Sequence, residues 1–190
     1  DSGAMYRGVT LYAQQHDLLE NKKLKTENLL SQLDDIHLRF EGDNFWLNGV
    51  DVSAEIRSMQ VSEAVSLVAA IPQVRPFLVA HQRIMGASQS VVMDGRDIGT
   101  VVFPKADIKL FLTADVNIRA QRRFDELSAQ NTLTSVAEVR NNLAERDHLD
   151  STRADSPLVQ AADAIPLDAT RYSVESMRDH VLDLVAERLN

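Results

Sequence analysis

Short apolar runs alternate with helical patterns through the second half of the chain, and this alternation restricts the fold more than any other feature. The apolar runs cover residues 91–93, 108–112 and, more weakly, 164–168. Helical spacing covers residues 116–128, 135–150 and 173–189. Strands that are separated by helices usually pair in parallel through crossover connections. The pattern therefore predicts an α/β fold, with residues 91–93 as a buried strand.

The first half of the chain has a different pattern of apolar and polar residues. Residues 1–15 have the pattern of a turn that enters a helix, and the polar, leucine-containing residues 16–31 suggest short helices. Alternating apolar residues and Gly-containing turns in residues 35–52 predict a small antiparallel meander. Residues 53–83 return to helical spacing, and Pro72 is expected to begin a new helix.

Composition limits the class of protein. With 190 residues, of which 44% are hydrophobic, the chain can bury a core and is expected to form one body, with room for a small lobe. A net charge of −8 disfavours a nucleic-acid or membrane-surface binder, and the absence of cysteine excludes disulfides, thiolate zinc sites and thiol catalysis. No apolar run is long enough for a membrane span and the first residues do not resemble a signal peptide, so a cytoplasmic protein is expected.

The strongest local signal is Asp94-Gly95-Arg96-Asp97, which directly follows the predicted strand. Ligands of open α/β folds bind at the carboxyl ends of parallel strands. Asp94 has the position of an acidic residue that orients Mg²⁺, directly or through water, while Arg96 and Asp97 suit a phosphate and the base or sugar of a nucleotide. The alternative is a tight turn that contains its own Arg–Asp pair.

Two clusters of charged residues have helical spacing. Arg119, Arg122 and Arg123 share one helical face, and Arg146, Asp150 and Arg153 share another if that helix extends to residue 153. They flank residues 125–145 as the two stems of a lid over phosphates would. The alternative is salt bridging within each helix, for example between Arg146 and Asp150.

Five segments of the chain together resemble the bacterial cytidylate kinases, in the same order and spacing. They are Asp1-Ser-Gly-Ala-Met-Tyr-Arg7, Asp51-Val-Ser-Ala-Glu-Ile-Arg57, Ser66-Leu-Val-Ala-Ala-Ile-Pro-Gln-Val-Arg75, Asp94-Gly-Arg-Asp-Ile-Gly-Thr-Val-Val-Phe-Pro104 and Glu145-Arg-Asp-His-Leu-Asp-Ser-Thr-Arg153. The resemblance implies transfer of the ATP γ-phosphoryl group to CMP or dCMP. It also implies Mg²⁺ as cofactor and CMP or dCMP and ATP as partners. No nucleic-acid polymer or membrane partner is expected, and the chain is expected to be a monomer.

The resemblance also implies a set of site residues. CMP would be bound by Ser2, Arg7, Ser66, Arg75, Arg96, Asp97, Arg146 and Asp150. Ser66, Arg75 and Asp97 would read the pyrimidine, and the arginines would hold the phosphate. Arg119, Arg122, Arg123 and Arg153 would serve catalysis from the lid, and Asp94 would meet Mg²⁺. We expect the binding residues to converge around one pyrimidine monophosphate.

The resemblance further implies a P-loop NTPase-like parallel sheet flanked by helices, an enlarged monophosphate-binding lobe and an Arg-rich lid. The expected parts are core in residues 1–15, 85–118 and 156–190, the lobe with its small antiparallel sheet in residues 16–84, and the lid with its stems in residues 119–155.

The chain departs from that family in one respect. Members begin with a strand, a Gly-rich loop ending in Gly-Lys and a helix, and these 190 residues contain no such loop. We expect the chain to be part of a longer kinase and, taken alone, to bind CMP without turnover. The alternatives are a kinase for UMP, AMP or another small acceptor, a non-catalytic nucleotide-binding module, and a scaffold protein.

Overall fold

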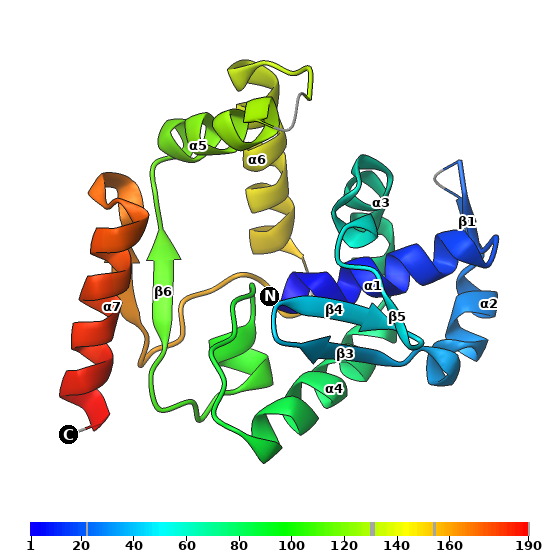
Figure 1. Cartoon of the computed structure of the whole chain (residues 1–190), viewed down its shortest axis with the longest axis horizontal. Coiled ribbons are helices and arrows are strands. Elements are labelled where there is room, and N and C mark those ends of the chain that lie inside the picture. The colour runs from blue at the N-terminus through cyan, green and yellow to red at the C-terminus, as the bar shows by residue number, and fades with distance from the viewer. Residues whose placement is uncertain (22, 130–131, 154, 190) are drawn as a thin grey trace. The chain divides into compact units, whose positions relative to one another are not determined.

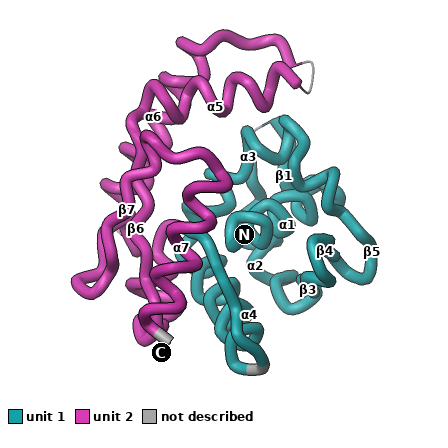
Figure 2. Tube along the Cα trace, turned by 60° about the vertical axis from the view of Figure 1, so that its left-hand side comes forward, with its two compact units in different colours: residues 1–95 teal, residues 96–190 magenta. Residues whose placement is uncertain are grey.

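The computed structural model describes residues 1–21, 23–129, 132–153 and 155–189. Its contacts divide the chain into unit 1, residues 1–95, and unit 2, residues 96–190 (Figure 2). The expectation of one body was therefore wrong, because length and composition limit the size of a core but do not show where contacts become sparse. The predicted α/β class is confirmed at the level of helices combined with small sheets (Figure 1).

Unit 1 is built around its first helix. Its helices are α1 (Ser2–Gln15), α2 (Thr26–Ser31), α3 (Met59–Ala69) and α4 (Val74–Ser88), with 3-10 turns η1 (Leu33–Asp35) and η2 (Glu55–Arg57). The Asp1 carboxylate accepts a hydrogen bond of 3.2 Å from the Ala4 amide, which caps α1. Met5 and Val9 of α1 are fully buried, and α1 packs on α3 and η2. This confirms the helix expected in residues 1–15.

The predicted meander is confirmed as a three-stranded antiparallel sheet, β3 (Leu38–Glu41), β4 (Asn44–Leu47) and β5 (Val50–Asp51). Gly42 and Gly49 turn the chain at positive φ, 57° and 83°, which glycine adopts without strain. The sheet packs closely on α1, since a Cβ atom on Gly8 would lie 2.7 Å from Cε1 of Phe45. Gly8 therefore sets the distance between α1 and β4.

Residues 16–31 contain one of the expected short helices, α2, and differ from the expectation before it. A two-stranded antiparallel pair, β1 (Leu19–Glu20) and β2 (Lys23–Leu24), precedes α2. Asp17 and Asn21 have φ of 54° and 51°, and left-handed residues interrupt a helix. The leucine spacing therefore did not produce a helix here, because one left-handed residue precedes β1 and another follows it.

Residues 53–88 form the expected helices. Pro72 lies in the turn two residues before α4 rather than at its first position. Within the residues described, no single helix is long and apolar enough to cross a membrane; α3 and α4, bent by 105°, reach the length and composition of a span only when taken together.

Unit 2 contains the parallel pairing that the sequence predicts. Its elements are the π-helical turn η3 (Ile98–Val102), β6 (Leu110–Thr113), α5 (Val116–Ala129), α6 (Val136–Thr152), β7 (Ile165–Asp168), the 3-10 turn η4 (Ala169–Arg171) and α7 (Val174–Leu189). Strands β6 and β7 pair in parallel, with Leu110 opposite Ile165 and Leu112 opposite Leu167. Helices α5 and α6, which connect the two strands, pack on each other (Figure 1).

The buried strand predicted at residues 91–93 is not present. These residues form no ladder with any strand in the described part of the chain, and Val92 is fully exposed. An extended segment gains little stability without a neighbouring strand. The apolar run alone therefore did not suffice to form a strand.

A capping box at the start of α6 is confirmed and makes stability depend on pH. Ser135 Oγ accepts a hydrogen bond from the Glu138 amide, and the Glu138 carboxylate accepts one from the Ser135 amide. The hydrogen bond from the Ser135 hydroxyl, followed by those from the Ser135 amide and the Thr134 hydroxyl, lowers the pKa of Glu138 below its ordinary value of 4.5. Since the folded pKa is the lower one, the stabilisation is present above pH 4.5 and is lost as the pH falls through the folded pKa.

We expect Ser135→Ala to lower the free energy of unfolding by about 1 kcal/mol at pH 7 in urea titrations. In Glu138→Gln the free energy of unfolding should fall less steeply between about pH 6 and pH 3 than in the unsubstituted chain. Glu145→Gln, an exposed change on the same helix, serves as control. Equal pH slopes for Glu138→Gln and the unsubstituted chain would contradict the role of this carboxylate.

Candidate functional site

The predicted site residues are divided between the two units. Unit 1 contains Ser2, Arg7, Ser66, Arg75 and Asp94; unit 2 contains Arg96, Asp97, Arg119, Arg122, Arg123, Arg146, Asp150 and Arg153. Each set is described within its own unit.

In unit 1 the start of α1 is tied to the end of the segment that leads to Asp94. The Ser2 amide donates a hydrogen bond of 3.0 Å to the Asp94 carbonyl. Arg7, one and a half turns along α1, donates from Nη2 to the Asp1 carboxylate at 2.6 Å. Ser2 and Asp94 are thus neighbours within unit 1.

Arg75 lies on α4 and only 6% of it is exposed. Its guanidinium carbon lies 5.7 Å from the ring centroid of Tyr6, the residue next to Arg7. Buried arginine is uncommon, and its planar fork suits the oxygen atoms of a ligand. Ser66 is exposed on α3. Tyr6 was not selected from the sequence, although it lies within the first of the five matching segments.

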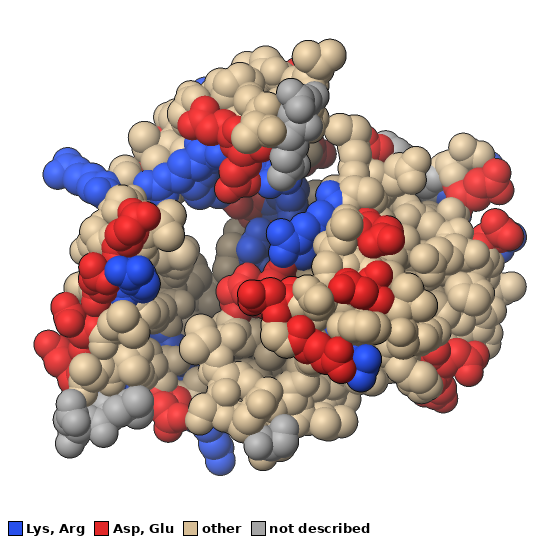
Figure 3. Space-filling view, viewed as in Figure 1, with Lys and Arg blue, Asp and Glu red and all other residues tan. Residues whose placement is uncertain are grey.

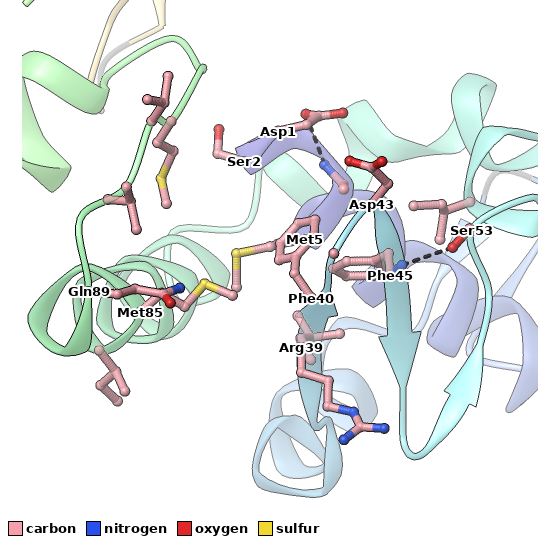
Figure 4. A pocket seen from close by; sticks show the side chains of 18 of the residues that line it. Asp1, Ser2, Met5, Arg39, Phe40, Asp43, Phe45, Ser53, Met85 and Gln89 are labelled. Carbon is pink, nitrogen blue, oxygen red and sulfur yellow. Dashed lines mark hydrogen bonds between the residues drawn. The ribbon is translucent and has the colours of Figure 1, made fainter.

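A cavity of about 860 Å³ opens in unit 1 between α1, the meander and the end of α4 (Figure 4). Met5 and Met85 point toward one another across it, and Phe40 and Phe45 line it from the sheet. Of the CMP residues expected in unit 1, Ser2 alone is among the described lining residues. This cavity is lined by both apolar and polar side chains, and it does not coincide with the expected nucleotide contacts.

In unit 2, Asp150 of α6 joins two of the predicted arginines. Arg96 Nε donates to Asp150 Oδ2 at 2.7 Å, and Arg153 Nη1 lies 3.6 Å from Asp150 Oδ1. The partner of Arg96 is thus 54 residues away along the chain, and not a carboxylate of its own turn. Two guanidinium groups around one carboxylate make a cationic cluster that can attract a phosphate.

Asp97 is held at the start of the π-helical turn η3 and is 7% exposed. Its carbonyl accepts hydrogen bonds from the amides of Val101 and Val102, at 2.8 and 3.2 Å. Single π turns are rare and occur often at functional sites. The sequence pattern did not predict this turn, and Gly99 within it was the available signal.

The three arginines of α5 have separate partners. Arg119 donates to the Asp147 carboxylate at 2.6 Å and to the Ala114 carbonyl, and Arg123 pairs with Glu126 at 2.8 Å. Arg122 donates to the carbonyls of Ala169, Thr170 and Tyr172 around η4. Basic and acidic side chains accordingly lie side by side over α5 on the face shown in Figure 3. Arg146 is exposed on α6.

The carboxylate of Asp94 can take part in a magnesium site. Its side chain is 79% exposed. The described residues contain no group of three or more His, Asp or Glu side chains that could enclose a metal. Mg²⁺ is commonly held by one or two carboxylates together with substrate phosphates, so a single accessible carboxylate fits that mode.

Comparison with known proteins identifies the family of the chain. The Cytidylate kinase family model matches residues 1–187. A protein named cytidylate kinase from Parabacteroides distasonis is 48% identical over 189 residues, which are 96% of this chain and 82% of the relative. Proteins of the same name from Flavobacterium psychrophilum and Porphyromonas gingivalis are 48% and 44% identical, over 97% and 98% of this chain and 84% of each relative.

Proposed function

The chain belongs to the cytidylate kinase family, and we propose from this that it transfers the γ-phosphoryl group of ATP to CMP or dCMP. A phosphate oxygen of CMP attacks the γ-phosphorus, the bond from that phosphorus to the bridging oxygen breaks, and CDP and ADP result. The observation that carries the proposal is the family match over residues 1–187. A cytoplasmic location and a monomeric state stay predictions.

The CMP contacts are proposed for the eight residues expected from the sequence. Burial of Arg75 and Asp97 supports a role in reading the base. A base that binds beside them loses its water, so a base without matching hydrogen-bonding groups would leave these side chains unpaired and would bind more weakly. The arginine cluster around Asp150 supports a role in holding the phosphate. Phosphoryl transfer depends mainly on positioning and charge neutralisation, which such residues provide.

The four lid arginines are proposed to meet the phosphates of ATP and the transition state. Arg119 and Arg123 each hold a carboxylate that a phosphate can replace as partner. Arg122 donates hydrogen bonds to the backbone carbonyls of Ala169 and Tyr172, which fix the position of its guanidinium. Arg153 is proposed to contact a phosphate because it lies beside Asp150, in the arginine cluster that is proposed to hold phosphate.

Asp94 is proposed to hold Mg²⁺, through water or directly. When bound, Mg²⁺ neutralises charge on the phosphate oxygens of ATP. These 190 residues contain no Gly-rich loop ending in Gly-Lys, the element that cradles ATP phosphates in P-loop enzymes. We therefore propose that these 190 residues supply the CMP side of the reaction and that, taken alone, they bind CMP with little or no kinase activity.

Calorimetric titration tests the proposal. CMP and dCMP should bind the 190-residue chain, UMP and AMP should bind at least about tenfold more weakly, and Mg·ATP should give little heat. Preference for AMP would overturn the assignment in favour of a purine nucleotide kinase. No binding of any monophosphate would overturn the CMP site itself.

A further inference from the structure

Lys109, which directly precedes β6, is a lysine with a largely buried side chain, and it does not belong to the proposed site. Its side chain is only 7% exposed. Nζ donates to the Pro104 carbonyl at 2.6 Å and to both Asp163 carboxylate oxygens at 2.8 Å. An ammonium group has three donors, and each has an acceptor here. Because its side chain is largely buried and all three donors are hydrogen-bonded, Lys109 has a defined position.

The methylene stem of Lys109 lies against η3. A Cβ atom on Gly99, the second residue of η3, would lie 3.2 Å from Cδ of Lys109 and 3.5 Å from its Cγ. Glycine therefore leaves the space through which the stem passes. The stem contacts the beginning of the π turn, and the ammonium group holds the Pro104 carbonyl just after its end.

The same turn carries Asp97. The amides of Val101 and Val102, both within η3, donate to the Asp97 carbonyl, and the Phe103 amide donates to the Ile98 carbonyl at 2.7 Å. A shift of η3 must therefore move the backbone of Asp97. Lys109 is in turn fixed to the start of β7, because its carbonyl accepts from the Ile165 amide at 2.9 Å and its ammonium group binds Asp163.

We propose that Lys109 is a positioning residue that holds η3 and thereby sets the place of the Asp97 carboxylate in the CMP site. In this role Lys109 acts on the site through η3, which it meets at Gly99 and at the Pro104 carbonyl just after the turn. The proposal rests on the proposed function, because it takes Asp97 as a reader of the pyrimidine. The hydrogen bond from Lys109 is also the main cause that lowers the pKa of Asp163, in keeping with a persistent ion pair.

Lys109→Met tests the proposal, since methionine keeps the length of the stem and removes the ammonium group. Lys105→Met is the matched control, because Lys105 is exposed on the same connection. By calorimetry, CMP affinity should fall about tenfold in Lys109→Met and the preference for CMP over UMP should largely disappear. The amides of Val101 and Val102 should exchange hydrogen about tenfold faster. Lys105→Met should change none of these.

Asp163→Asn provides a second variant should Lys109→Met fail to fold. It should lower CMP affinity and speed amide exchange at Val101 and Val102, each by a smaller factor than Lys109→Met. An equal loss of CMP and UMP affinity would show general destabilisation and overturn the proposal, as would unchanged exchange at Val101 and Val102. If the unsubstituted chain binds no CMP, the proposed function fails. In that case, faster amide exchange at Val101 and Val102 in Lys109→Met still supports the claim that Lys109 holds η3 in position. Unchanged exchange overturns that claim.

Discussion

Asp97→Asn is expected to weaken CMP binding by about 100-fold, the largest effect of a single functional change in this chain. A buried carboxylate that accepts hydrogen bonds from a ligand contributes about 1.5–3 kcal/mol, which corresponds to about 10- to 100-fold in affinity. Asp97 is 7% exposed, so water cannot replace the lost acceptor at low cost. Asparagine keeps the shape of the side chain and leaves the carbonyl that holds η3 in place.

Calorimetry with CMP gives the affinity, and thermal unfolding shows whether the fold is retained. Asp107→Asn is the control, because Asp107 is an exposed aspartate on the connection between η3 and β6. It should bind CMP within about twofold of the unsubstituted chain. Unweakened CMP binding by a folded Asp97→Asn variant would remove Asp97 from the site.

Phe45→Ala is expected to lower the free energy of unfolding by about 3–5 kcal/mol, the largest effect on stability. Phe45 is 2% exposed, meets the ring of Phe40 edge to face at 4.9 Å and lies against Gly8 of α1. Its loss leaves a cavity between the meander and the helix around which unit 1 is built. Since domains are stable by about 5–15 kcal/mol, a large part of the stability would be lost.

Urea unfolding followed by circular dichroism measures this loss. Gly8→Ala should by itself destabilise by about 1–3 kcal/mol, because its methyl group would meet the Phe45 ring. Combined with Phe45→Leu, it should cost less than the sum of the two separate changes. Val50→Ala, at a site 60% exposed on β5, should stay within about 0.5 kcal/mol. A cost below about 1 kcal/mol for Phe45→Ala would contradict the close packing of β4 on α1.

Elements with a clear local period were predictable. The helices α1, α5, α6 and α7, the meander and the parallel pair β6 and β7 all lie within a few residues of the predicted ranges. The capping box of Ser135 and Glu138 was predictable for the same reason, because both partners lie within one turn. The strand expected at residues 91–93 failed because a strand depends on a neighbour that its own residues do not specify.

The candidate site shows the same division. Residue types and their spacing selected Asp94, Arg96, Asp97 and the arginines of α5 and α6 as candidates, and the resemblance of five segments indicated the family. The pairing of Arg96 with Asp150 and of Lys109 with Asp163 was not readable from spacing, since each joins residues 54 positions apart. Such contacts depend on the path of the intervening helices and turns. Local patterns act over one or two turns of chain, whereas these side chains meet only after the chain has folded.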